Sequence, residues 1–454
     1  NMNILLYTPP VPKQSVRMDY LISCEPLELE YLYTVLEAEH SVAIMEKGKE
    51  KKLTKQIDSR NVKMLCISCY ITQVTYVLLL VEKLKKEFPE LYIVVGGVHA
   101  EVVPEHFFSP FIDAVVFGNH LTAIQEIAQG VSKNEPPENV EGAAFKINGF
   151  KIQTQQSFTN NIPIPKRIQF EANPEKYYYF YLNACATVKT AFGCPGKCSF
   201  CFCRKMNDGK YSTRPIEQVV DEIEQLTAQN IFIVDDNFLT SKKRLETFCD
   251  ELERRKIHKN YITYGTSEFI SANPDLIARL KLNGLTALIV GFEYITESAL
   301  HSVNKKATVA DNDATIAVCR NLNIDLFALF ICDPDWKHAE FIRLAKYVRK
   351  NKIPFATYST PTVLPNTDEA IQQKTQFDTA RLWSYDLLHL HQKPKNISAF
   401  SYYLWLYFLY LIPATRFSSL KHLLTRYGFW NGMKLLFNST MNGALYFLKL
   451  LIYK

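Results

Sequence analysis

The chain has 454 residues, of which 47% are hydrophobic and 22% are charged, and its formal net charge at pH 7 is +6. This length exceeds what one hydrophobic core usually supports, so two or three domains are expected. The net charge is modest and no block of Lys and Arg residues occurs, which argues against a protein that binds nucleic acid.

Eleven cysteines occur in the chain. Outside one loop they are scattered through apolar segments such as residues 64–67, a pattern typical of buried free thiols and not of a disulfide framework. A strand is predicted from residue 3, with no charged leader before it. We therefore expect a cytoplasmic protein in a reducing compartment.

Strands alternate with helices over residues 1–135. This alternation predicts a doubly wound parallel sheet of the Rossmann type. The strands are predicted at residues 3–10, 41–45, 62–70, 91–95 and 114–117, and the helices at 25–39, 74–88 and 122–131. Ligands bind beyond the carboxyl ends of such strands. Those ends carry Thr8, Pro9, Ser68, Gly96, Gly97, His99 and Gly118.

Residues 136–185 join this sheet to the rest of the chain. Asn148-Gly149 is a strong type I′ turn signal, so a hairpin is expected over residues 138–156. A proline-rich run at 162–165 and three tyrosines at 177–179 then form a linker. The tyrosines either pack between domains or line a substrate channel.

Three cysteines lie within eight residues, directly after an apolar segment at 188–192. Cys194, Cys198 and Cys201 are separated by three and two residues. Three thiolates suit a soft metal centre but leave one position open, whereas a structural zinc site would use a fourth ligand. The alternative is a zinc knuckle that borrows Cys203 or a distant histidine, although Cys203 is too close to Cys201 to share one metal without strain.

This spacing, with Phe200 directly before the last cysteine, resembles the radical S-adenosylmethionine (SAM) superfamily. The resemblance implies a [4Fe-4S] cluster held by three cysteines, with SAM on the fourth iron. It also implies SAM contacts at strand ends and beside the cluster. The residues in those places are Phe200, Asp235, Asp236, Ser267 and Glu293.

A second strand–helix alternation covers residues 186–375. Six strand–helix units fit the partial (β/α)6 barrel of that superfamily, in which chemistry lies at the carboxyl ends of the strands. The strands are predicted at residues 187–192, 231–234, 262–265, 287–291, 326–331 and 356–360.

Residues 3–133 resemble the cobalamin-binding domain that precedes many radical SAM modules. The resemblance implies that cobalamin contacts the strand-end residues named above, from Thr8 to Gly118. None of the ten histidines falls in a D-x-H-x-x-G pattern, so cobalamin is expected without a protein histidine ligand. The alternative is a degenerate domain that binds nothing.

Residues 376–454 are expected to be helical, basic and rich in aromatic residues. Apolar runs at 402–412 and 445–453 fall short of the roughly 20 residues that span a bilayer. Basic amphipathic helices suit an anionic membrane surface, so residues 400–454 are predicted to contact the inner face of the membrane peripherally. The alternative is a helical cap on the barrel. From residue 381 onward the one acid is Asp386, and the bases are Arg381, Lys393, Lys395, Arg416, Lys421, Arg426, Lys434, Lys449 and Lys454.

The resemblance implies a cobalamin-dependent radical SAM enzyme, in which the cofactors carry the difficult chemistry. The leading hypothesis is a C-methyltransferase that acts on an unactivated carbon of a small, hydrophobic or lipid-like metabolite. It would use a 5′-deoxyadenosyl radical, methylcobalamin and an external electron donor such as flavodoxin or ferredoxin. The second hypothesis is ring formation, ring contraction or oxidation without methyl transfer, as in the anaerobic bacteriochlorophyll ring cyclase group. The third is a non-catalytic cobalamin or iron–sulfur sensor, which would not need Glu293 beside the cysteines.

Overall fold

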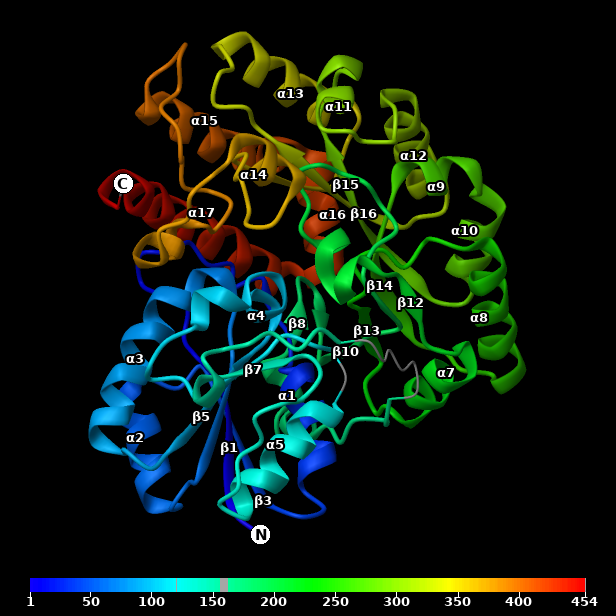
Figure 1. Cartoon of the computed structure of the whole chain (residues 1–454). Helices are drawn as coiled ribbons and strands as arrows, with labels where there is room; N and C mark the ends of the chain where they lie inside the picture. Colours follow the sequence, from blue (N-terminus) through cyan, green and yellow to red (C-terminus); the bar gives the residue numbers. More distant parts are fainter. Residues whose placement is uncertain (120, 156–161, 454) are drawn as a thin grey trace.

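The computed structural model describes residues 1–119, 121–155 and 162–453. Two α/β bodies lie one above the other, and a group of C-terminal helices packs beside the upper one (Figure 1). His120 and residue 156, the last residue of the predicted hairpin, lie outside the described residues.

The lower body is built on a six-stranded sheet with the order β3-β1-β4-β5-β6-β7. Helices cover both faces, because alternate residues of each strand are apolar on both sides: Leu5 and Tyr7 belong to one core, and Ile4 and Leu6 to the other. The doubly wound prediction is confirmed. The strands are β1 (Asn3–Thr8), β3 (Ser41–Glu46), β4 (Met64–Ser68), β5 (Tyr92–Gly96), β6 (Ala114–Val116) and β7 (Ala143–Phe145), and the helices are α1 (Leu27–Leu36), α2 (Glu50–Ser59), α3 (Val74–Glu87), α4 (Val98–Val102) and α5 (Thr122–Ser132).

The chain reverses at Asn148-Gly149, where a hairpin is predicted, but the returning arm is not a regular strand. Strand β7 pairs antiparallel with β6, where the edge of the sheet offers free backbone groups. Gly149, with a φ of 73°, ends a short 3-10 turn at Lys146–Asn148. In the described part of this segment, the returning chain forms only an isolated bridge between Ala143 and Gln153. The first arm of the predicted hairpin therefore joins the edge of the sheet, and the second arm pairs with it through few hydrogen bonds.

The upper body is a curved sheet of six parallel strands, paired in chain order. Residues such as Phe232, Ile262 and Phe327 fill its inner side. This arrangement confirms the predicted partial barrel. The strands are β10 (Cys185–Val188), β13 (Asn230–Ile233), β14 (Asn260–Gly265), β15 (Leu285–Glu293), β16 (Asp325–Ile331) and β17 (Phe355–Ser359), and the outer helices are α7 (Ile216–Gln225), α8 (Lys242–Arg255), α9 (Ser267–Ala272), α10 (Pro274–Leu282), α11 (Glu297–Ser302), α12 (Val309–Asn321) and α13 (His338–Lys350).

The segment between the two bodies packs tightly against both. Tyr179 lies inside the barrel, and the Tyr177 hydroxyl donates a hydrogen bond to Glu46 at 2.6 Å. The short strands β2 (Ile22–Ser23), β8 (Tyr178–Tyr179) and β9 (Leu182–Asn183) form a small sheet here. The tyrosines thus serve as packing between domains.

A buried guanidinium ties the two bodies together. Arg167 is 4% exposed and donates to Glu25 at 2.6 Å and to the carbonyl oxygen of Thr187 at 2.5 Å. It also pairs with Glu222 of the barrel helix α7. Such a network is costly to break from one side, because a buried charge would remain without its partner.

The C-terminal helices are α14 (Asp368–Gln373), α15 (Ala399–Leu411), α16 (Phe417–Tyr427) and α17 (Phe429–Ile452). Helix α15 buries Tyr402 and Leu406 against the barrel, so this part of the tail is a cap. Helix α17 has 24 residues and is long and apolar enough to cross a membrane by length and composition. The apolar run at 445–453 is thus part of a longer helix, because the polar residues around 438–442 interrupt the run but not the helix.

Candidate active site

The three clustered cysteines lie on a loop at the carboxyl end of the first barrel strand. The loop leaves strand β11 (Ala191–Phe192) and returns through β12 (Ser212–Thr213), which pairs antiparallel with it. Gly193 has a φ of 75°, and a Cβ there would lie 2.3 Å from the carbonyl oxygen of Lys210. Only glycine lets the two arms of the loop cross this closely.

Later segments of the barrel hold the loop in place. The Ser199 backbone N–H donates to the carbonyl oxygen of Val303 at 3.3 Å, and the Asn304 side chain donates to that of Lys197 at 2.9 Å. The side chain of Phe200 packs in an apolar cluster with Tyr294. These tethers fix the loop between two strand ends before any cofactor binds.

The thiols suit a multi-iron cluster better than a single ion. Cys194, Cys198 and Cys201 are partly buried, and burial raises the pKa of the Cys194 thiol to about 11. Over the described residues, no three His, Cys, Asp or Glu side chains converge on a site for one metal ion. In a [4Fe-4S] cluster each thiolate binds a different iron, so the three thiols need not converge. This arrangement disfavours the zinc knuckle and fits the cluster.

Asp235 is engaged with the base of this loop. It is 1% exposed, and its Oδ1 accepts hydrogen bonds from the backbone N–H groups of Thr190 at 2.6 Å and Ala191 at 3.1 Å. Its Oδ2 accepts from the Thr190 hydroxyl. Both oxygens accept hydrogen bonds from the protein, an arrangement that suits a residue that positions the loop better than a contact to SAM.

The neighbouring strand ends present carboxylates with spare acceptor atoms. In the described structure, Asp236 Oδ2 and Glu268 Oε2 are buried and lack a hydrogen-bond partner. Ser267, by contrast, donates to Asn312 of helix α12 at 2.5 Å and is fully buried. Glu268 directly follows Ser267 at the same strand end, but only Ser267 was predicted to contact SAM.

Glu293 lies at a distorted strand end. It has a φ of 60°, and the register between β15 and β16 shifts between Gly291 and Glu293. Its Oε1 receives a hydrogen bond from the Lys305 ammonium at 3.0 Å, with both side chains largely buried. Burial acts to lower the pKa of Lys305, but the adjacent Glu293 carboxylate outweighs it and the pKa is raised. Lys305 lies in a loop without periodic pattern, so the sequence offered no signal for it.

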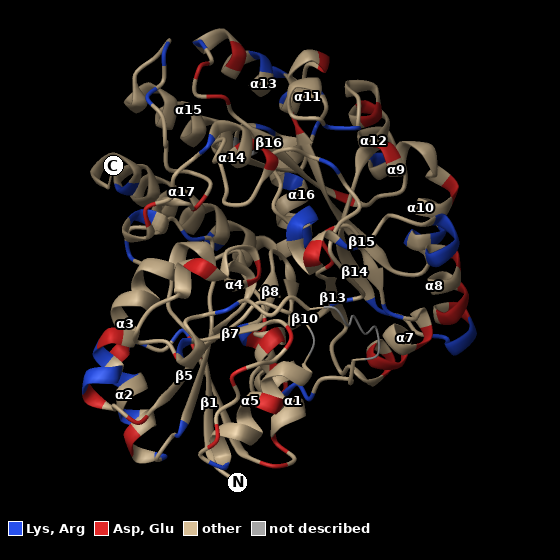
Figure 2. Cartoon of the chain, in the orientation of Figure 1, with Lys and Arg blue, Asp and Glu red and all other residues tan. Residues whose placement is uncertain are grey.

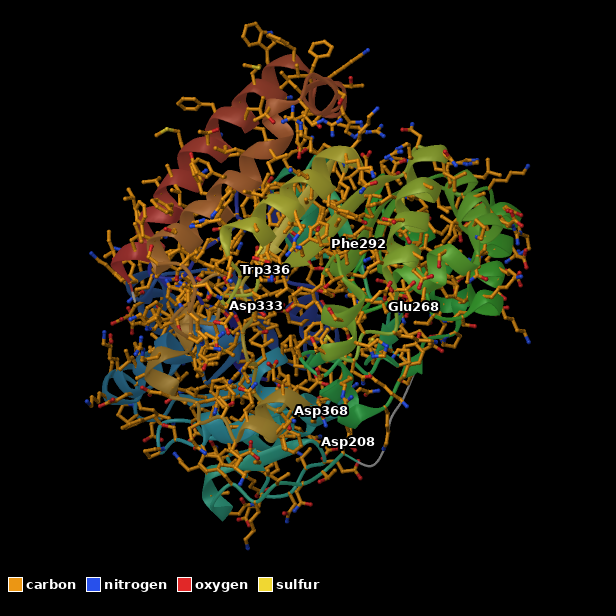
Figure 3. The ribbon with its side chains drawn as sticks, turned by 90° about the horizontal axis from the view of Figure 1, so that it is seen from above. Asp208, Glu268, Phe292, Asp333, Trp336 and Asp368 are labelled. Atoms are coloured by element: carbon orange, nitrogen blue, oxygen red, sulfur yellow. The ribbon has the colours of Figure 1, made fainter. Side chains whose placement is uncertain are left out.

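The buried acceptor atoms and the Glu293–Lys305 pair surround the triad. Burial raises the pKa of the Cys198 thiol; the nearby Lys305 ammonium opposes this rise, and the Glu293 and Glu268 carboxylates add to it. In the view from above, Glu268, Phe292 and Asp333 lie in the central part of the molecule (Figure 3). A zwitterionic ligand with ammonium and hydroxyl donors and a carboxylate, such as SAM, matches these groups.

The carboxyl ends of the lower sheet face the cluster loop across a cavity of about 430 Å³. From the lower body it is lined by Glu101, His106 and Gly118, and from the upper body by Lys205 and Asn207. The Asn207 backbone N–H donates to Glu101 at 2.6 Å, which joins the two walls. Cofactor sites are found preferentially at the interfaces between domains, which is where this cavity lies.

Some of the predicted cobalamin contacts bond to the protein itself, and one of them lines the cavity. Ser68 donates to Glu28 at 3.0 Å, and Thr8 accepts from the Lys47 backbone N–H at 3.1 Å, so these hydroxyls are engaged at the strand ends. The carbonyl oxygen of Pro9 accepts from Gln73 at 2.8 Å. Of the predicted residues, Gly118 lines the cavity.

Two of the three glycines at these strand ends, Gly97 and Gly118, are required by the protein's own packing. A Cβ on Gly97, whose φ is 92°, would lie 2.6 Å from the Cys69 nitrogen, and one on Gly118 would lie 2.9 Å from the Gly142 Cα. Gly96 is looser, with a Cβ position 3.4 Å from the carbonyl oxygen of Val116. Close backbone approach therefore shapes the edge that the ligand would meet.

His99 is buried against a second histidine. Its Nε2 lies 2.9 Å from His106 Nδ1, and the rings stack at 5.1 Å. Burial, with the neighbouring His106, lowers the pKa of His99 to about 3, so the ring is neutral. His106, not His99, reaches the cavity.

The fold and the site define a class of protein: a doubly wound ligand-binding domain followed by a partial barrel whose cysteine loop faces it. Two family models match the chain, the B12 binding domain over residues 20–128 and the Radical SAM superfamily over residues 188–348. Together they cover more than half of the chain. The chain belongs to the radical SAM enzymes that carry a B12-binding domain.

Known proteins with this organisation resemble the chain over most of its length. The hopanoid C-3 methylase of Methylococcus capsulatus is 24% identical over 80% of this chain and 72% of its own. The anaerobic magnesium-protoporphyrin IX monomethyl ester cyclase of Cereibacter sphaeroides is 24% identical over 68% of this chain and 53% of its own. The structure of the cobalamin-dependent radical enzyme OxsB with aqua-cobalamin bound superposes with a TM-score of 0.70 at 14% identity, covering 99% of this chain and 72% of that one.

These matches confirm the predicted cofactors. The protein is a cobalamin-dependent radical SAM enzyme, with a [4Fe-4S] cluster, SAM and cobalamin as its cofactors. The alternative of a degenerate first domain is thereby set aside.

Proposed function

We propose that the protein methylates an unactivated carbon of a small, hydrophobic metabolite. The observation that carries this proposal is the cavity between the two domains, which adjoins both the strand ends of the B12-binding domain and the segment after the cysteine loop. A methyl carrier is useful only if it lies next to the carbon that has lost its hydrogen. The hopanoid methylase among its relatives supports both methyl transfer and an apolar substrate.

Residues of this chain would hold and orient the reactants. We propose that Cys194, Cys198 and Cys201 hold the cluster, and that Asp236 and Glu268 accept hydrogen bonds from SAM. When bound, the cluster supplies an electron, SAM the fragment that abstracts hydrogen, and cobalamin the methyl group. An external one-electron donor, such as a flavodoxin or ferredoxin, would reduce the cluster.

The structure also offers a means to exclude water from the reaction. The Glu369 backbone N–H at the start of α14 donates to the carbonyl oxygen of Ser199 at 3.2 Å, and Asp368 pairs with Arg204 at 2.6 Å. Figure 3 shows Asp368 and Asp208 on the same side of the molecule. This contact lays the loop after β17 over the cysteine loop. We propose that it shields the radical, which would otherwise be quenched by side reactions.

The second candidate is ring formation, ring contraction or oxidation without methyl transfer, favoured by the similarity to the anaerobic cyclase. Anaerobic incubation of protein reconstituted with the cluster and cobalamin, with SAM, a reductant and a hopanoid as trial substrate, followed by mass spectrometry, separates the two. Substrate-dependent S-adenosylhomocysteine together with 5′-deoxyadenosine and a product heavier by one methyl group indicates radical methylation. Substrate-dependent 5′-deoxyadenosine with a product that lacks the added methyl group supports the second candidate and refutes methyl transfer. Cys198→Ala serves as the control that should form neither product.

A further inference from the structure

The outer face of helix α17 is apolar and uncovered. Along one side, large apolar residues recur every three or four positions, and they remain about half to four-fifths exposed; Trp430 is 82% and Phe437 is 68% exposed. The members of this outer stripe are Phe429, Trp430, Met433, Phe437, Met441, Leu445, Leu448 and Ile452. A contiguous apolar surface of this kind on a globular protein marks an interaction site.

The inner face of the same helix is apolar as well, and it is used by the protein. Leu450 is 6% exposed, and the Phe447 ring lies 5.6 Å from that of Phe400. A Cβ on Gly443 would lie 2.9 Å from the Tyr407 ring, so α17 approaches α15 closely there. Because α15 packs on the barrel and holds α17 along one side, α17 cannot be surrounded by lipid as a single spanning helix would be. Its geometry suits a helix that lies flat on a surface.

The Lys and Arg residues near the outer stripe of α17 favour contact with an anionic surface. Residues 387–454 contain no Asp or Glu but eight Lys and Arg residues. Helices α15 and α17 are almost free of charged residues, whereas α2 and α8 carry many of both signs (Figure 2). Lys434 and Lys449 lie on α17 itself, and Lys421 lies on α16. A bare apolar stripe with flanking cations matches the interface of an anionic bilayer better than a polar protein partner.

A cavity of about 220 Å³ lies beneath the helix, between α15, α16, α17 and the edge strand β17. Its walls are mainly apolar, and include Phe355, Leu406, Leu423 and Leu436. An apolar cavity of roughly 150 Å³ already stays dry and takes up a small hydrocarbon. The polar side chains that reach this one are chiefly Thr357, Ser419, His422, Ser439 and Thr440.

We propose that α17 lies in the headgroup region of an anionic bilayer and that the cavity beneath it receives the end of one hydrocarbon chain of a membrane lipid. The outer stripe supplies the contact with the bilayer, and the inner face of the helix forms the wall of the lipid site. The site lies along β17 and the C-terminal helices, and it shares no lining residue with the polar cavity at the cysteine loop. The inference therefore stands apart from the reaction that the enzyme catalyses.

Flotation of the full-length protein with vesicles tests the bilayer contact. Binding is expected to vesicles of phosphatidylcholine with phosphatidylglycerol and to be much weaker with phosphatidylcholine alone. Phe437→Glu should weaken it at least tenfold, since burial of one large apolar side chain is lost. Leu282→Glu is the matched control, because Leu282 is 87% exposed on α10, away from α17, and should leave binding unchanged.

Fluorescence titration with cis-parinaric acid tests the cavity. Ser439→Phe should fill it and weaken binding at least tenfold, whereas Ser418→Phe, on the exposed side of α16, should not. Equal binding by these two variants would overturn the lipid site. Absence of vesicle binding, or equal binding to neutral vesicles, would overturn the bilayer contact. The protein could instead fail to bind vesicles and self-associate in ultracentrifugation, with Phe437→Glu abolishing the self-association. That result would show that a second copy covers the stripe, and it would also overturn the bilayer contact.

Discussion

Replacing Asp235 tests whether this carboxylate positions the cysteine loop. Asp235→Ala leaves the backbone N–H groups of Thr190 and Ala191 buried without an acceptor. Each unsatisfied buried donor costs about 1–3 kcal/mol, so the free energy of unfolding should fall by about 4 kcal/mol. For a domain of the size of the barrel, this loss of stability corresponds to a melting temperature lower by roughly 8–16 °C. Asp235→Asn keeps one acceptor oxygen and should cost much less.

The assay combines thermal unfolding followed by circular dichroism, iron content after anaerobic reconstitution, and SAM affinity by equilibrium dialysis. Asp235→Ala should lower the melting temperature and the iron content together, because the base of the loop is loosened. Asp236→Ala should keep both and lose SAM affinity, since its Oδ2 is unpartnered. If Asp235→Ala instead kept the wild-type melting temperature and lost SAM affinity as Asp236→Ala does, Asp235 would contact SAM directly and the positioning role would be refuted.

Three further predictions concern the loop, the domain joint and the tail. Gly193→Ala should abolish the absorption of the iron–sulfur cluster, because its Cβ would lie 2.3 Å from the Lys210 carbonyl oxygen, while Gly149→Ala, with open space around its Cβ, should retain it. Arg167→Met should lower the free energy of unfolding in urea by about 3 kcal/mol, since Glu25 stays buried without its cation while Glu222 keeps Arg214; an unchanged midpoint would contradict this contact between the two bodies. Asp325→Asn should make the chain around residues 412–416 more sensitive to protease, because Asp325 holds His422 and Arg426 of α16 at 2.9 Å.

The Asp325 contact also predicts a pH dependence. Burial acts to raise the pKa of Asp325, but hydrogen bonds from His422 and Tyr181 outweigh it and the pKa lies below the ordinary 3.8. A depressed carboxyl pKa contributes stability that is present above the unfolded value and is lost as the pH falls through the folded one. Thermal stability of the wild type should therefore fall more steeply below about pH 4 than that of Asp325→Asn. Parallel curves would contradict the contact.

The contacts between the lower body and the barrel hold the cobalamin-binding edge and the cysteine loop at a fixed distance. Besides Arg167, the segment Thr379–Ser384 returns from the barrel to the lower body, where Leu382 is fully buried in the core under α3. The Thr75 hydroxyl donates to the carbonyl oxygen of Thr379 at 2.6 Å. Two separate ties of this kind leave the cofactor faces little freedom to part, which a reaction between two cofactors requires.

The sequence by itself determined both domains and the cluster loop. Alternating strands and helices, and three cysteines at fixed spacing, are local patterns, which can be recognised in a sequence whose fold is not known. The turn at Asn148-Gly149 was also visible, but its pairing depended on the free edge of a distant strand, β6.

Only the tertiary structure decided which polar side chains are free to bind a ligand and which bond to the protein itself. Asp235 and Asp236 are adjacent in sequence, yet one faces the backbone of Thr190 and the other has a spare oxygen, because successive residues at a strand end point in different directions. Lys305 reaches Glu293 through a loop that no periodicity marks. Likewise, the composition of the tail shows that α17 is apolar, but only packing shows that α15 and the barrel cover one face of the helix and leave Trp430 and Phe437 in water.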